Sequence, residues 1–282
     1  MKMISINTNY GGLYAAKAAK SSQALVDTAM ERLSTGKRIN YAKDDAAGQA
    51  IAVRLTAEIQ GLAIASRNAA DGQSLLDTAE GALQETTSLL LRMRELAVQS
   101  SNGTLSTADR TALQTEAASL ESEITRIAET TTWGGLQLLD GTFSGTSGDA
   151  AIVFQAGTKS GQTIAVTIPE MTVSAATISY TAAQTIGSFA SAQTAITQID
   201  AALSGVNEVR GALGAASNRL DSTIGNLNQI RVNLMASKGR IMDADFATET
   251  GNLAKGQILQ QAATAMLAQA NASKQTVLTL IR

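Results

Sequence analysis

The chain carries, from Leu55 to Ala97, the segment LTAEIQGLAIASRNAADGQSLLDTAEGALQETTSLLLRMRELA. Its apolar residues recur at every seventh position, as Leu55, Leu62, Ala69, Leu76, Leu83, Leu90 and Ala97. A second repeat of the same period follows later in the chain, as Ile199, Val206, Leu213, Leu220, Leu227, Leu234 and Ile241. A sustained seven-residue period is typical of long helices that bury one stripe against another helix. Because the two repeats lie toward opposite ends of the chain, we expect the chain to fold back and pair them.

The composition supports a helical bundle. The chain has 282 residues, of which 44% are hydrophobic but only 3% are aromatic, and it contains a single proline. A wide globular core normally uses more aromatic side chains, because each buries a large area, whereas alanine and leucine suit thin seams between helices and favour the helical state. We therefore predict a mainly α fold, a long antiparallel helical bundle or coiled-coil rod built from both chain ends, with a small β-hairpin region in the middle.

Local signals place the individual elements. Gly36 is suited to end a first helix in the left-handed conformation, and Ser106 with Asp109 forms a capping-box signature for a third. The helices are expected at residues 5–34, 44–100, 106–130, 188–237 and 243–282. Between residues 131 and 180 the helical period vanishes, and alternating residues predict strands at 152–154 and 162–168, with a further β-like run at 171–180.

The absence of two residue types excludes several kinds of chemistry. The chain has no histidine and no cysteine, which rules out Ser–His triads, thiolate catalysis and Cys- or His-based metal sites. Two acidic pairs, Asp44 with Asp45 and Asp243 with Asp245, leave a metal or acid–base role formally open. A carboxylate before a helix more often accepts the unpaired N–H groups of its first turn, so capping is favoured. We expect no catalytic residue, no cofactor and no metal, and we do not expect an enzyme.

The charge pattern indicates no polyanionic partner. The net charge is −2, from 22 basic and 24 acidic residues that are interspersed rather than gathered in a basic stripe, so nucleic-acid binding is not expected. No stretch is apolar over the roughly 18 residues that would suggest a membrane span. The opening MKMISINTNYGG lacks the apolar run of a cleavable secretion signal. The protein is therefore expected either in the cytoplasm or exported by a route that reads no cleavable signal.

Six blocks, in order and at both ends, resemble those of bacterial flagellins. They are INTN (Ile6–Asn9), LSTGKRINYAKDDAAGQAI (Leu33–Ile51), RMRELAVQSSNG (Arg92–Gly103), DADFATET (Asp243–Thr250), QILQQAATAMLAQAN (Gln257–Asn271) and VLTLIR (Val277–Arg282). The resemblance implies a subunit that polymerises helically into the flagellar filament for swimming. It also implies an extracellular location, reached unfolded through the flagellum's own channel, and partners in the export apparatus, an export chaperone and the filament cap.

The same resemblance implies a layout for the chain. Residues 1–43 with 237–282 would line the inner tube of the filament, and residues 44–236 would form an outer-tube helical rod. A short β-containing segment at about 131–185 would belong to that rod, with no separate large outer domain. The two end segments are expected to remain mostly disordered in the monomer, because their apolar stripes have no partner there. On polymerisation they are expected to fold against each other and against neighbouring copies. The candidate subunit-interface residues are Ile6, Leu13, Val26, Met30, Leu33, Leu253, Leu259, Met266, Val277 and Leu280.

A second site follows from the resemblance alone. Flagellins of this type are bound by the vertebrate innate-immune flagellin receptor through the segment that matches Arg92 and Leu96 here, and through the following helix, which holds Glu116. The competing interpretation is that Arg92 faces solvent or a neighbouring subunit while Leu96 belongs to a core or an interface.

Two further protein classes fit part of the pattern. A hook–filament junction protein shares similar terminal helices, but the dense sequence blocks favour a true flagellin. A cytoplasmic signalling coiled coil would also show seven-residue repeats without these blocks. Electron microscopy of the purified protein separates the three classes, because only a flagellin is expected to form long tubes unaided.

Overall fold

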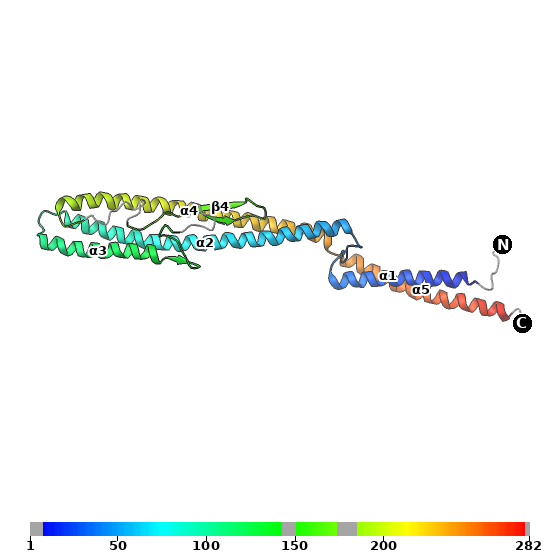
Figure 1. Ribbon diagram of the computed structural model, residues 1–282. Coiled ribbons are helices and arrows are strands. Elements are labelled where there is room, and N and C mark those ends of the chain that lie inside the picture. The colour runs from blue at the N-terminus through cyan, green and yellow to red at the C-terminus, as the bar shows by residue number, and fades with distance from the viewer. Residues whose placement is uncertain (1–7, 143–150, 174–184, 280–282) are drawn as a thin grey trace. The chain divides into compact units, whose positions relative to one another are not determined.

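A computed structural model describes residues 8–142, 151–173 and 185–279, with side chains as far as Ser273. These residues form a mainly α fold with five helices and four short strands (Figure 1). The helices are α1 (Tyr10–Thr35), α2 (Ala46–Ser100), α3 (Thr107–Thr130), α4 (Phe189–Met242) and α5 (Phe246–Thr279). The strands are β1 (Thr132–Trp133), β2 (Leu136–Gln137), β3 (Ala151–Gln155) and β4 (Thr163–Thr167). The chain divides into two compact units, residues 1–59 with 232–282 (unit 1) and residues 60–231 (unit 2).

Most of each apolar repeat is buried in unit 2, as the period predicts. The α2 repeat is buried from Leu62 to Ala97, and the α4 repeat is buried from Ile199 to Leu227. The stretches from Ala69 to Ala97 and from Ile199 to Leu220 belong to one continuous cluster of buried side chains. Three polar pairs cross between the helices, Gln73 with Asp221, Glu80 with Arg210 and Arg94 with Asp200. Because numbers rise along one helix as they fall along the other, the two helices are antiparallel.

Helix α3 adds the third wall of this core. Its first turn has the predicted capping box, in which the Ser106 hydroxyl accepts the Asp109 N–H and the Asp109 carboxylate accepts the Ser106 N–H. Its apolar side, which includes Ile124, is buried in the same cluster. The Arg110 guanidinium donates to the carbonyl oxygen of Ser100 at 3.0 Å. This contact holds the start of α3 against the end of α2.

The middle of the chain forms two hairpins. Strands β3 and β4 pair antiparallel, from Ala151 opposite Thr167 to Gln155 opposite Thr163, which confirms the two predicted strands to within about a residue. Asn68 of α2 donates to the carbonyl oxygen of Gln155 at 3.3 Å, so this hairpin lies on α2. The smaller β1–β2 hairpin was not predicted, because strands of two residues are too short to show an alternating pattern.

The predicted β-like run at 171–180 is wrong for its first three residues, and the remaining ones lie outside the described residues. Residues 171–173 are not in a strand. The N–H of Met171 donates to the carbonyl oxygen of Leu139 at 2.8 Å, and its side chain is buried in the core. The apolar residues of this segment therefore fill the core from an irregular loop.

Unit 1 holds two breaks in the helical chain, one between α1 and α2 and one between α4 and α5. Gly36 ends α1 at φ 68°, the left-handed conformation expected for it. The carbonyl oxygen of Gly36 accepts a hydrogen bond from the N–H of Ala244, and the N–H of Arg38 donates to the carbonyl oxygen of Met242. Helix α4 continues to Met242, beyond the predicted end at residue 237, and the N–H of Asp243 still donates to the carbonyl oxygen of Gly239 at 2.8 Å.

Candidate assembly surface

The terminal helices α1 and α5 lie side by side in unit 1 (Figure 1). They approach closely at Gly256, where an added Cβ would stand 2.8 Å from Cγ2 of Val26 and 3.5 Å from the carbonyl oxygen of Ser22. The missing side chain of Gly256 therefore lets the two backbones meet. Val26 and the neighbouring Ala29 are buried in this seam.

Polar contacts fix the two ends of the seam. At one end the Arg32 guanidinium lies 2.8 Å from the Glu249 carboxylate, which is only 7% exposed and also accepts a hydrogen bond from Asn252 at 3.1 Å. At the other end Asn9 donates to the side chain of Asn271 at 3.2 Å. These pairs run in opposite numerical order, so α1 and α5 are antiparallel.

Burial and hydrogen bonding act on Glu249 in opposite directions. Burial raises the pKa of the Glu249 carboxyl, but the hydrogen bonds from Asn252 and Arg32 and the charge of Arg32 outweigh it. The net effect holds the pKa of Glu249 below its ordinary value. The carboxylate is therefore ionised at neutral pH and completes the polar end of the seam.

The seam covers only part of the apolar surface of the two helices. Large apolar side chains remain exposed on both, namely Tyr10, Leu13, Tyr14, Met30, Phe246, Ile258, Leu259 and Met266. Leu13 and Met266 are each 63% exposed. A mainly apolar groove of about 660 Å³ lies between α1 and α5 and is lined in part by Tyr10, Tyr14, Leu259 and Met266. Apolar surface gathered in this way usually marks an interaction site.

The structure distributes the predicted interface residues among three environments. Leu13, Met30, Leu259 and Met266 are exposed on the pair, and Leu33 and Leu253 are half-buried. Val26 is buried between α1 and α5, so it stabilises the pair rather than its surface. Ile6, Leu280 and the side chain of Val277 lie outside the described residues. Whether any of these contacts another subunit stays a prediction.

The two chain ends were expected to fold against each other on polymerisation, and α1 and α5 do pack against each other in the structure. Whether they are disordered before assembly stays a prediction. Sequence reasoning missed Tyr10 and Tyr14, which point out of the seam at 72% and 79% exposure. Their spacing of four residues, with Leu13 between them, was the signal for one helical face.

The acidic pairs cap local structure. Asp45 accepts the N–H of Gly48 at 2.9 Å and Asp245 accepts the N–H of Ala247 at 2.9 Å, each at the start of a helix. Hydrogen bonds from the Thr248 hydroxyl and from backbone N–H groups lower the pKa of Asp245. Asp44 accepts the N–H groups of Asn40 and Tyr41. The capping interpretation is confirmed for Asp45 and Asp245, whereas Asp44 holds the loop that precedes α2.

The segment matched to receptor binding lies in unit 2. Arg92 of α2 is exposed, and its guanidinium lies 2.8 Å from Glu116 of α3 and 2.9 Å from Glu95. The two carboxylates raise the pKa of Arg92, and the hydrogen bond to Glu116 is the largest cause. Leu96 is 1% exposed and belongs to the core, as the competing interpretation held. Of the three residues matched to receptor binding, Arg92 and Glu116 have exposed side chains.

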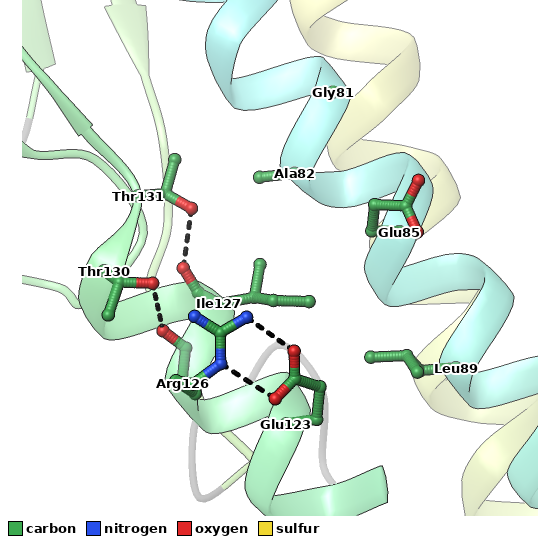
Figure 2. A pocket seen from close by; sticks show the side chains of 9 residues that line it. All are labelled: Gly81, Ala82, Glu85, Leu89, Glu123, Arg126, Ile127, Thr130 and Thr131. Atoms are coloured by element: carbon green, nitrogen blue, oxygen red, sulfur yellow. Dashed lines mark hydrogen bonds and ion pairs between the residues drawn. The ribbon is translucent and has the colours of Figure 1, made fainter.

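A second hollow of about 440 Å³ separates α2 from α3 (Figure 2). Arg126 forms a two-bonded pair with Glu123, and the hydroxyls of Thr130 and Thr131 donate to backbone carbonyl oxygens. Figure 2 shows Leu89 and Ile127 between the two helices, with Glu85 on the α2 side. The Arg126, Thr130 and Thr131 groups are thus engaged in holding α3 together. The hollow has no arrangement of nucleophile and base.

Within residues 8–142, 151–173 and 185–279, no three acidic side chains gather in a way that would hold a metal ion. No helix among the described residues is both long enough and apolar enough to cross a membrane.

Comparison with known proteins identifies the family. Residues 6–144 match the bacterial flagellin N-terminal helical region, and residues 196–281 match the bacterial flagellin C-terminal helical region. A flagellin of Halalkalibacterium halodurans is 47% identical over 254 residues, which are 90% of this chain and 91% of that one. The chain belongs to the bacterial flagellins. It is a structural subunit of the extracellular flagellar filament, which drives swimming.

Two further similarities bear on this flagellin. The flagellar filament 33 kDa core protein of Treponema phagedenis is 39% identical over 284 residues, covering 98% of this chain and 99% of that one. A solved Vibrio parahaemolyticus protein described as flagellar hook-associated has a TM-score of 0.60, at 18% identity, and covers 71% of this flagellin and 100% of its own chain. At that identity the likeness shows a shared fold alone, so nothing favours the hook-junction alternative.

Proposed function

We propose that this flagellin polymerises through the apolar face that α1 and α5 leave exposed, and that other copies of the chain cover this face in the filament. The observation that carries the proposal is the exposure of Leu13, Leu259 and Met266 on the α1–α5 pair, where Leu259 and Met266 line the apolar groove. Two helices can bury only the stripe along which they meet, so the rest of their apolar surface needs another partner.

The size of the effect is enough to support assembly. Burying one leucine or methionine side chain stabilises by roughly 1.5–3 kcal/mol. Several such side chains on one face offset the loss of freedom on association, which costs roughly 4–15 kcal/mol. A helical polymer is the expected product, because contacts between different faces of identical subunits continue from copy to copy unless a ring closes.

We further infer the layout of the subunit within the filament. Residues 1–43 with 237–282 form the inner tube and residues 44–236 the outer-tube rod, without a separate large outer domain. What supports this is the grouping of the two chain ends into unit 1 and the continuous helical core of unit 2. The boundaries of the units, at residues 59 and 232, differ from those of the proposed layers because α2 and α4 run through both.

The finer biology of the subunit is inferred from its family. We infer export through the flagellar channel without a cleavable signal, with an export chaperone, the export apparatus and the filament cap as partners. We infer no enzymatic role, since the acidic pairs that remained open at the sequence level include Asp45 and Asp245, whose carboxylates cap helices.

Assembly through the α1–α5 face is tested by two polar substitutions. Leu13→Gln and Leu259→Gln each remove an exposed apolar side chain, so helicity of the free subunit should stay unchanged. The critical concentration for polymerisation should rise by about tenfold to a hundredfold for each, as expected for losing the burial of one leucine. Thr264→Gln changes an exposed side chain on the same helix and is the matched control. Normal polymerisation of both leucine variants would overturn the proposal.

A second candidate function is incidental binding by the vertebrate flagellin receptor. It is favoured by the exposed Arg92–Glu116 pair, which joins two helices on one face of unit 2. Monomeric protein should activate receptor-bearing reporter cells, and Arg92→Glu should weaken that response while circular dichroism stays unchanged. A reporter line that stays silent at micromolar protein would remove this function.

A further inference from the structure

The described methionines of this flagellin differ in exposure between the two units: those of unit 1 are exposed or, for Met242, half-buried, and those of unit 2 are buried. Met30 of α1 and Met266 of α5 are 56% and 63% exposed, and Met235 of α4, also in unit 1, is half exposed. Met93 and Met171 of unit 2 are each 1% exposed. Among the described side chains, the accessible thioethers therefore lie in the unit proposed to mediate assembly, while those of unit 2 are shielded.

Among the exposed methionines, Met266 has the position at which oxidation would most affect the proposed assembly surface. Its side chain lines the α1–α5 groove beside Leu259 and Tyr14, where apolar surface dominates. A methionine thioether is apolar and flexible, which suits a surface that another helix must cover. Oxidation converts it into a polar sulfoxide, and burying such an oxygen without a donor is unfavourable.

We propose that Met266, with Met30, is an oxidant-sensitive modification site through which a peroxide or a hypohalous acid switches off assembly of the free subunit. With hydrogen peroxide, the sulfur lone pair attacks one peroxide oxygen, so an S–O bond forms as the O–O bond breaks. The thioether loses two electrons, and the departing hydroxide takes the proton of the transferred hydroxyl and leaves as water. The inference rests on the proposed function, because the modification matters only where another copy covers this face.

The same geometry predicts when the site is open. In the free subunit both thioethers face solvent, so oxidation precedes assembly. In the filament the covering copies exclude the oxidant, so assembled subunits are protected. Unit 2 keeps its fold throughout, because Met93 and Met171 lie in a closed core.

The test treats full-length free subunit with hydrogen peroxide and follows each methionine by peptide mass spectrometry. Met30 and Met266 should oxidise at least tenfold faster than Met93 and Met171. The critical concentration for polymerisation should rise at least tenfold, and methionine sulfoxide reductase should restore it. Equal rates for the exposed and buried residues, or unchanged polymerisation of subunit oxidised at Met30 and Met266, would overturn the inference.

Two variants separate this inference from the proposed function. Met30→Leu/Met266→Leu keeps the side-chain volume and should polymerise equally well with and without peroxide. Loss of its polymerisation after peroxide would place the sensitive group elsewhere and sink the inference. Met266→Gln places a polar group in the groove without oxidant. Normal assembly of Met266→Gln would count against the proposed assembly surface itself. If Met266→Gln assembles poorly while the oxidised wild-type protein assembles normally, the oxidation inference alone is refuted.

Discussion

The α1–α5 seam depends on the absence of a side chain at Gly256. In Gly256→Ala the new Cβ would lie 2.8 Å from Cγ2 of Val26 and 3.4 Å from its backbone nitrogen. Carbon atoms in contact prefer about 3.5–4.0 Å, so the helices must separate or Val26 must leave its rotamer. Valine in a helix has one strongly preferred rotamer, which leaves little room for adjustment. Overpacking of this kind costs about 1–3 kcal/mol.

A second glycine of the same helix supplies the control. An added Cβ at Gly251 would meet nothing within 4 Å, and this position is exposed. Both substitutions gain helix propensity of about 1 kcal/mol. The difference between Gly256→Ala and Gly251→Ala therefore isolates the packing cost, since the propensity gain cancels.

Native-state hydrogen exchange of the full-length chain measures this difference. Amides in α1 and α5 should exchange roughly five- to 150-fold faster in Gly256→Ala than in Gly251→Ala, the factors that correspond to about 1–3 kcal/mol. Val26→Ala removes the clashing methyl groups and should make the Gly256→Ala change far less costly in that background. Equal stabilisation by both alanines would refute the close packing that the structure shows.

Three further changes test other parts of the fold. The Glu249 carboxyl has a lowered pKa, so its contribution to stability is full above the unfolded pKa of about 4.3 and is lost as pH falls through the folded pKa. Protection of the α1 and α5 amides against hydrogen exchange should fall in that acid range, and Glu249→Gln should make this protection less dependent on pH. Leu83→Ala empties a position that is 0% exposed and should destabilise unit 2 by about 2–5 kcal/mol in denaturant unfolding, whereas unchanged stability would contradict the core assignment. Ser106→Ala removes the α3 capping box and should cost about 0.5–2 kcal/mol, measured as faster exchange confined to the first turn of α3.

Helix positions and the core of unit 2 were accessible from the sequence because their signals are periodic. The repeat from Leu62 to Ala97 places every seventh residue on one face, and that face is buried. The helix caps were predictable because they are local: Ser106 with Asp109, and Gly36, each interact within about one helical turn. These features depend on neighbours along the chain, which the sequence specifies directly.

The exposed face of the candidate site was only partly predictable. The seven-residue spacing predicted that Leu259 and Met266 share one stripe. It did not show that Val26 would be buried inside the α1–α5 seam, where it cannot contact another subunit. That outcome depends on Gly256, whose role appears only when α1 lies against it. Leu96 illustrates the converse case, because a residue carried over from family resemblance as a contact proved to be part of the core.

The contrast between the two units explains why similar apolar patterns have different consequences. In unit 2 the stripes of α2 and α4 also meet α3 and the β3–β4 hairpin, so residues such as Leu83 are covered from every side. In unit 1 the α1–α5 pair has a single seam, and Leu13 and Met266 remain outside it. A helix pair without a third wall keeps part of its apolar surface free for other molecules. We therefore propose that assembly depends less on a special motif than on how few elements accompany the terminal helices, and that a helix from another copy covers the apolar surface that the pair leaves exposed.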